Sequence, residues 1–165
     1  MATALHHLSE HDPTSVPSGA GRRFALVVSE WNREVTDALR QGARETLLRY
    51  GVAEADIVER WVPGSFELAS GAQFLLEAGD LHGVVCLGSV VRGETPHFDF
   101  VCQGTTQGIM AVGLKFSLPV IFGVLTDDTM QQAQDRSGGK HGNKGVDCAV
   151  ALLKMAAFRS ASAAH

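Results

Sequence analysis

Apolar positions follow two spacings along the chain. Four short segments are apolar at most or all positions, as in strands buried between helices; they are residues 24–29, 57–62, 83–87 and 119–125. Elsewhere apolar residues recur at helical spacing, beginning with Val35, Leu39, Ala43 and Leu47. The same spacing predicts helices at residues 66–78, 97–115 and 128–137, and a last helix with Val146, Val150, Leu153 and Ala157.

Strands that alternate with helices predict a parallel sheet joined by right-handed crossovers. We therefore expect an α/β fold, a three-layer, flavodoxin-like sandwich with about four parallel strands. The segment 57–62 differs from the other three because it carries Glu59 and Arg60. Polar residues of this kind place it at an edge of the sheet.

The two ends of the chain lack this pattern. Residues 1–22 are polar and without a period, and predict a flexible arm. Part of this arm is expected to dock on a neighbouring subunit, where it would add a strand to the sheet. Residues 23–159 form the predicted domain, and residues 160–165 a fraying tail.

Composition narrows the classes of partner. The chain has 165 residues, 45% of them hydrophobic, and a net charge of −4, so no basic surface favours nucleic acid. No apolar run is long enough for a membrane span, and none near the start is typical of a signal peptide. Cys86, Cys102 and Cys148 suit neither a disulfide framework nor a zinc site, so we expect buried free thiols and a reducing cytoplasm. The histidines lack metal-ligand spacing, and no metal site is expected.

Unusual residues gather where the predicted strands end, which is where sheets of this kind bind ligands. Residues 88–97 are the most informative of these segments. Thr95 and Pro96 predict a helix start, with Thr95 as the cap and Pro96 at the first helical position. Free N–H groups there attract an anion, Gly93 allows close approach, and His97 in the first turn can move protons. A capped helix with a surface histidine explains the same residues equally well.

The other segments also allow either a ligand-binding or a purely structural interpretation of their residues. Trp31 suits stacking on a flat heterocycle or closing of the core, and Glu67 suits a hydroxyl or simply the start of a helix. Phe122 lies in an apolar strand, where core packing is the default. Arg136 precedes a Gly- and Lys-rich segment that suits phosphate, or a solvated basic helix end; its spacing is not that of a nucleotide P-loop.

Five segments together resemble the lumazine synthase family. They are residues 29–32 (SEWN), 62–67 (VPGSFE), 88–99 (GSVVRGETPHFD), 119–126 (PVIFGVLT) and 142–147 (GNKGVD). The resemblance runs from about Arg23 to Phe158. It implies riboflavin biosynthesis, in which 5-amino-6-(D-ribitylamino)uracil condenses with 3,4-dihydroxy-2-butanone 4-phosphate to give 6,7-dimethyl-8-ribityllumazine, phosphate and water. It implies no metal and no organic cofactor.

The resemblance also assigns roles to matching residues. Trp31, where many relatives have Phe, would stack on the pyrimidine. His97 would transfer protons, and Glu94 and Thr95 would form the phosphate-binding turn. The uracil and its ribityl chain would be held by Ser65, Phe66 and Glu67, with Ser89, Val90 and Val91 as a further pyrimidine-binding stretch.

A neighbouring subunit is expected to complete the site. The resemblance implies that Phe122, Arg136 and Lys144 reach it from the adjacent chain, with Arg136 on the phosphate. The resemblance implies a homo-oligomer, a pentamer, and the short glycine-rich linker before the last helix resembles that of family members in which pentamers assemble into a 60-subunit shell. A non-catalytic lumazine- or flavin-binding relative and a flavodoxin-like module for another ligand are the alternatives. The presence of His97, Arg136, Glu67 and Thr95 together disfavours the non-catalytic relative, and Arg136 with Lys144 disfavours the flavodoxin-like module.

Overall fold

The computed structural model describes residues 7–163 and is built on a parallel sheet. The sheet has four strands in the order β2-β1-β3-β4. The strands are β1 (Phe24–Ser29), β2 (Ile57–Val62), β3 (Val84–Val91) and β4 (Val120–Asp127). The predicted edge position of β2 is confirmed, because β2 pairs with β1 alone. There Glu59 receives hydrogen bonds or ion pairs from Arg40 and Arg44 of α1.

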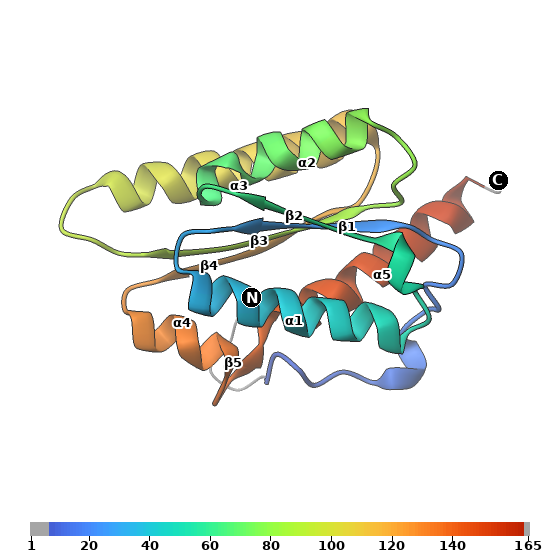
Figure 1. Cartoon of the computed structure of the whole chain (residues 1–165), viewed down its shortest axis with the longest axis horizontal. Coiled ribbons are helices and arrows are strands. Elements are labelled where there is room, and N and C mark those ends of the chain that lie inside the picture. The colour runs from blue at the N-terminus through green and yellow to red at the C-terminus, as the bar shows by residue number, and fades with distance from the viewer. Residues whose placement is uncertain (1–6, 164–165) are drawn as a thin grey trace.

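Helices cover both faces of the sheet (Figure 1). One face carries α1 (Arg33–Arg49), α4 (Met130–Arg136) and α5 (Lys144–Ser162), and the other carries α2 (Leu68–Glu77) and α3 (His97–Phe116). Alternate residues of β1 point to opposite faces: Leu26 packs in the core beneath α1 and α5, whereas Val27 packs beneath α2 and α3. The three-layer, flavodoxin-like fold predicted from the sequence is confirmed.

Several element boundaries differ from the prediction. β3 continues to Val91, so residues 88–91, which were expected in a turn, are strand. They stay in the sheet because β4 extends to Asp127 and Val91 pairs with that residue. The loop between β3 and α3 is therefore only residues 92–96.

Three predicted helices and the glycine-rich linker change as well. The helix expected at 66–78 divides into a 3-10 turn, η3 (Ser65–Glu67), and α2; α3 ends one residue later than expected, at Phe116. α4 is shorter than expected, since Thr129 rather than Asp128 forms a capping box with Gln132. The linker forms a small antiparallel hairpin of β5 (Ser137–Gly139) and β6 (Gly142–Asn143).

The chain ends are more ordered than expected. Leu8 is buried and its N–H donates to the carbonyl of His141 at 2.7 Å, while Ser9 Oγ accepts from the N–H of Asn143 at 2.9 Å. A short 3-10 helix, η1 (Pro13–Ser15), follows, and Val16 joins the core. The expectation of a flexible arm is therefore wrong for residues 7–22, because Leu8 and Val16 have apolar surface to bury. Residues 1–6 lie outside the described part.

α5 also runs into the predicted tail, as far as Ser162. Residues 160–162 are therefore helical, and the expected boundary after residue 159 is too early. Residues 164 and 165 lie outside the described part. Within residues 7–163, none of the helices combines the length and the apolar composition that a membrane crossing needs.

The three cysteines are free thiols. Cys86 and Cys148 are buried as predicted, and burial raises the pKa of Cys148 to about 12 and that of Cys86 still further. Cys102 is only half-buried on α3, so the prediction was wrong in that respect. A buried thiol with a raised pKa is a poor nucleophile, which leaves Cys86 and Cys148 a packing role.

Candidate active site

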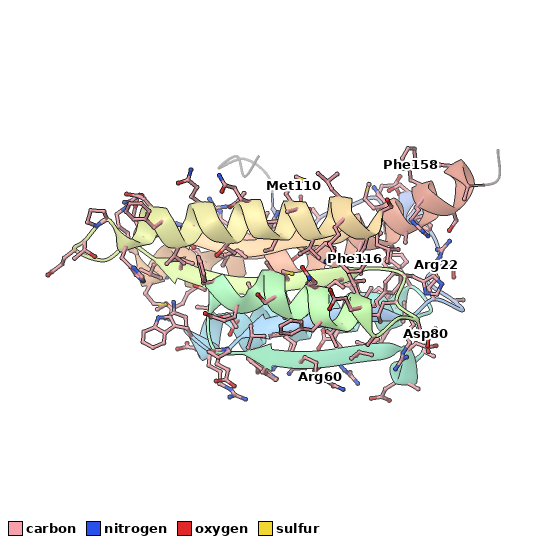
Figure 2. The ribbon with its side chains drawn as sticks, turned by 90° about the horizontal axis from the view of Figure 1, so that it is seen from above. Arg22, Arg60, Asp80, Met110, Phe116 and Phe158 are labelled. Atoms are coloured by element: carbon pink, nitrogen blue, oxygen red, sulfur yellow. The ribbon has the colours of Figure 1, made fainter. Side chains whose placement is uncertain are left out.

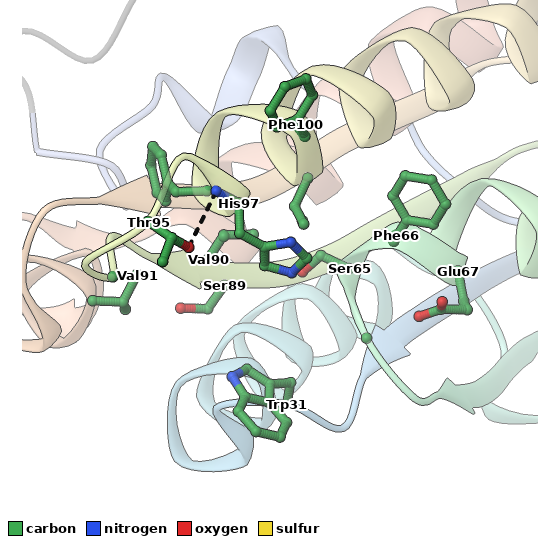
Figure 3. A pocket seen from close by; sticks show the side chains of 14 residues that line it. Trp31, Ser65, Phe66, Glu67, Ser89, Val90, Val91, Thr95, His97 and Phe100 are labelled. Carbon is green, nitrogen blue, oxygen red and sulfur yellow. Dashed lines mark hydrogen bonds between the residues drawn. The ribbon is translucent and has the colours of Figure 1, made fainter.

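A hollow with a volume of about 630 Å³ opens where β1 and β3 end (Figure 3). A volume of this size suits small organic ligands. Nine of the thirteen residues predicted for the site line it: Trp31, Ser65, Phe66, Glu67, Ser89, Val90, Val91, Thr95 and His97. The structure therefore brings together segments that are up to 66 residues apart in the sequence (97 − 31).

Trp31 enters the cavity on the turn between β1 and α1. The next residue, Asn32, has φ of +56°, a left-handed conformation that asparagine tolerates better than most residues. Asn32 Nδ2 donates to the carbonyl of Ser89 at 3.0 Å, which fixes this turn against β3. The indole is 72% exposed, so the alternative that it closes the core is wrong. Its face is free for a flat ligand.

Ser65 and Ser89 form the polar floor of the cavity. Their exposed fractions are 5% and 1%, and neither hydroxyl has a hydrogen-bond partner within residues 7–163. Gly88 is required here, because a Cβ at that position would lie 2.5 Å from Ser65 Oγ. A buried hydroxyl without a partner costs about 1–3 kcal/mol. A ligand with a polar edge would remove that cost.

η3 places Phe66 and Glu67 on the opposite rim from the start of α3 (Figure 3). The Phe66 ring lies against α3 at Gly104, where a Cβ would approach it to 2.7 Å. Both side chains are exposed beside the cavity. An aromatic edge and a carboxylate acceptor are therefore available to one ligand.

The start of α3 is where an anion site was predicted. The helix begins at His97, as the range 97–115 predicted, but Thr95 is not its cap, because Pro96 at φ −62° holds the capping position and makes no side-chain capping bond. The N–H of His97 donates to Thr95 Oγ1 in a long bond of 3.4 Å. The imidazole of His97 projects into the cavity across from Trp31 (Figure 3). A titratable group thus stands beside a helix N-terminus, where anions are stabilised.

Three lining residues of α3 were missed by the sequence analysis. They are Phe98, Phe100 and Val101. Phe100 and Val101 follow His97 by three and four positions, which puts them on the same side of a helix as His97. That spacing is a usable signal once the helix start is known. Gly64 and Gly93 also line the cavity.

Four predicted site residues do not line this cavity. Glu94 lies in the loop beside it, and Phe122 is half-buried and borders another hollow with Cys102 and Thr126. Lys144 Nζ is held by Asp147 Oδ2 at 2.5 Å. Arg136 lines a polar hollow of about 370 Å³ at the end of α4.

Arg136 shares its hollow with a buried carboxylate. Its Nε lies 3.7 Å from Asp127 Oδ1, while Asp127 Oδ2 has no hydrogen-bond partner within residues 7–163. Burial raises the pKa of Asp127, and the attraction of Arg136 opposes this only in part. Asp127 therefore orients the guanidinium, but the Nη groups can still bind a ligand, because they make no hydrogen bond to any residue of the described part.

Asn143 has a structural role in the GNKG motif, residues 142–145. Its side chain accepts from Gly145 N–H at 2.8 Å and donates to the carbonyl of Ala38 at 2.9 Å. Gly145 is required because a Cβ there would overlap the carbonyl oxygen of Leu39. The motif thus joins α5 to α1. Among residues 7–163, no group of three His, Cys, Asp or Glu side chains is placed to hold a metal ion.

Comparison with known sequences decides the family. The family described as 6,7-dimethyl-8-ribityllumazine synthase matches residues 21–160. The chain belongs to this family. A relative of that name from Parabacteroides distasonis is 52% identical over 158 residues, which cover 96% of this chain and 99% of the relative. Another, from Porphyromonas gingivalis, is 51% identical over 156 residues, or 94% of this chain and 97% of the relative. The family resemblance read from five short segments is confirmed.

Proposed function

We propose that this enzyme condenses 5-amino-6-(D-ribitylamino)uracil with 3,4-dihydroxy-2-butanone 4-phosphate to form 6,7-dimethyl-8-ribityllumazine, with release of phosphate and water. Membership of the family supports the reaction. One observation carries it to this chain: a single cavity holds an exposed indole, a histidine at a helix start and two hydroxyls that have no hydrogen-bond partner among residues 7–163. These are the groups that a flat polar ring and a phosphate need.

The pyrimidine would lie against the Trp31 indole. Its ring N–H and carbonyl groups would meet the Ser65 and Ser89 hydroxyls, whose lack of protein partners favours this position. Val90 and Val91 would line its edge, and Phe66 would bound the pocket on the other side. The Glu67 carboxylate is an acceptor at the rim, suited to the ribityl hydroxyls.

The butanone phosphate would lie at the loop before α3. Backbone N–H groups near Glu94 and Thr95 and the helix dipole favour its phosphate. The uracil amine would attack the ketone and form an imine with loss of one water; the imine would then eliminate phosphate, and the ring would close with loss of a second water. His97 would move protons in these steps, and positioning of the two substrates would supply most of the rate. We assign no metal or organic cofactor to these steps.

A homo-oligomer is part of the proposal. Phe122, Arg136 and Lys144 lie away from the cavity of their own chain, so they are available to the cavity of a neighbour. α3 presents exposed apolar side chains, among them Phe100, Met110 and Leu114 (Figure 2 shows Met110). Large apolar side chains exposed along one helix would be stabilised by burial in a subunit interface. We propose a pentamer, with assembly into a 60-subunit shell, in which residues of the N-terminal arm add a strand to a neighbour's sheet.

The compartment we propose is the cytoplasm. Cys86, Cys102 and Cys148 are all unpaired, and free thiols persist where the surroundings are reducing. Partners other than small-molecule substrates and further copies of this chain are not part of the proposal.

A direct assay tests the reaction. The purified protein is mixed with both substrates, and the absorbance of the lumazine is followed against a mixture without protein. We expect a rate well above the spontaneous one, unchanged by EDTA. A protein that bound the lumazine with no increase in rate would instead be a non-catalytic binder, and the proposal would be wrong.

A further inference from the structure

Arg92 lies at one end of the loop that the proposed phosphate site uses. It is the first residue after β3, and its N–H donates to the carbonyl of Asp127 at 2.9 Å, which continues the pairing with β4. Its side chain does not line the cavity, although Val91 and Gly93 on either side do. Arg92 is therefore beside the site without facing it.

The guanidinium of Arg92 joins three parts of the chain. Nε donates to Asp128 Oδ1 at 2.8 Å, just after β4, and Nη1 lies 3.3 Å from Asp99 Oδ1 in the first turn of α3. The same group lies over the Phe98 ring, 4.1 Å from its centroid. The hydrogen bond to Asp128 and the pairing with Asp99 raise the pKa of Arg92, against a smaller desolvation effect. Only arginine combines a planar fork with stacking in this way.

The contacts of Arg92 lie beside the loop 93–96, which makes few hydrogen bonds itself. The hydrogen bonds of Thr95 and Pro96 reach only the first residues of α3, and residues 93–96 are all exposed. Asp128, by contrast, is anchored, because its N–H donates to Gln132 Oε1 at 2.8 Å in the capping box of α4. Arg92 thus ties both ends of a weakly held loop to a fixed point just after β4.

We propose that Arg92 is a positioning residue that sets the shape of the loop 93–96 and the placement of His97, and that it does not itself bind the phosphate. This inference rests on the proposed function. An exposed ion pair contributes little alone, but two carboxylates and a ring acting on one planar group hold it in a single orientation. The carboxylates also neutralise Arg92, which leaves it ill-suited to attract a second anion.

The test compares Arg92→Met, Asp128→Asn and the double variant. Arg60→Met is the matched control, since Arg60 is exposed on β2 and, among residues 7–163, its side chain donates only to the carbonyl of Glu59. We expect Arg92→Met to raise KM for the butanone phosphate about tenfold and to leave KM for the uracil substrate nearly unchanged. Asp128→Asn should raise the same KM, and the double variant should be no worse than Arg92→Met, as residues in one network are non-additive.

Direct binding of the phosphate by Arg92 predicts the opposite change in KM. If Arg92 bound the phosphate directly, Asp128→Asn would free it and lower KM for the butanone phosphate, and the inference would be overturned. Wild-type KM values in Arg92→Met would overturn it too. A wild-type protein without activity would refute the proposed function instead, and hydrogen exchange then decides this inference. Amides of residues 93–101 should exchange faster in Arg92→Met than in Arg60→Met, and equal exchange would contradict the positioning role.

Discussion

Replacement of Arg136 by alanine is the perturbation with the largest expected effect on one substrate. Arg136 is about three-quarters buried, with a side chain 27% exposed, and it is oriented by Asp127 with its Nη groups unbonded within residues 7–163. A charge-assisted hydrogen bond contributes about 1.5–3 kcal/mol, and about 1.4 kcal/mol corresponds to a tenfold change. We therefore expect KM for the butanone phosphate to rise about 10–100-fold, with KM for the uracil substrate nearly unchanged.

The assay is steady-state lumazine formation with each substrate varied in turn. Lys154→Ala is the control, because it removes the same charge from an exposed position on α5. The alanine leaves Asp127 without its cation, so the unfolding temperature is measured for each variant to separate lost binding from lost stability. Unchanged KM values in a folded Arg136→Ala protein would refute the phosphate role of Arg136.

Three other substitutions test separate parts of the account. His97→Ala should lower kcat about tenfold or more, the lower end of acid–base effects, and a wild-type kcat would remove its proton-transfer role. Asn32→Ala should cost about 1–2 kcal/mol, because it loses the bond to Ser89 and places alanine at positive φ, and so lower Tm by about 2–8 °C. Asp127→Asn should raise Tm at pH 7, because burial of the charged Asp127 carboxylate, which raises its pKa, lowers the stability of the folded protein at that pH. The gain should fade as the pH falls through ~4, the unfolded pKa, and vanish below it, where that carboxylate is protonated in both states; a gain independent of pH would contradict this.

The sequence predicted what depends on local spacing. Apolar runs located all four strands, and Glu59 and Arg60 placed β2 at the edge, because exposure of one strand is visible in its own residues. The lining of the cavity by Trp31, Ser65 and His97 followed in turn, since parallel strands bring their carboxyl ends to one edge.

Pairing between distant residues could not be predicted in this way. β3 reaches Val91 because that residue pairs with Asp127, and nothing in residues 88–91 alone distinguishes strand from turn. The order of residues 7–22 depends on contacts of Leu8 and Ser9 with the β5–β6 hairpin, more than 130 positions away (for Ser9 and Asn143, 143 − 9). The hydrogen bonds of Arg92 with Asp99 and Asp128 likewise exist only after the fold has formed.

In the proposed oligomer, one chain's cavity and another chain's Arg136 form a single active site. Co-expression of His97→Ala with Arg136→Ala chains tests this arrangement, because each variant lacks a different half of the site. In a randomly mixed cyclic assembly about a quarter of the sites would have both halves intact. With the butanone phosphate well below its wild-type KM, we predict that the mixed protein recovers about a quarter of the wild-type rate, above that of either parent. A rate no higher than the mean of the two parents would show that each chain builds its site alone and would contradict the account.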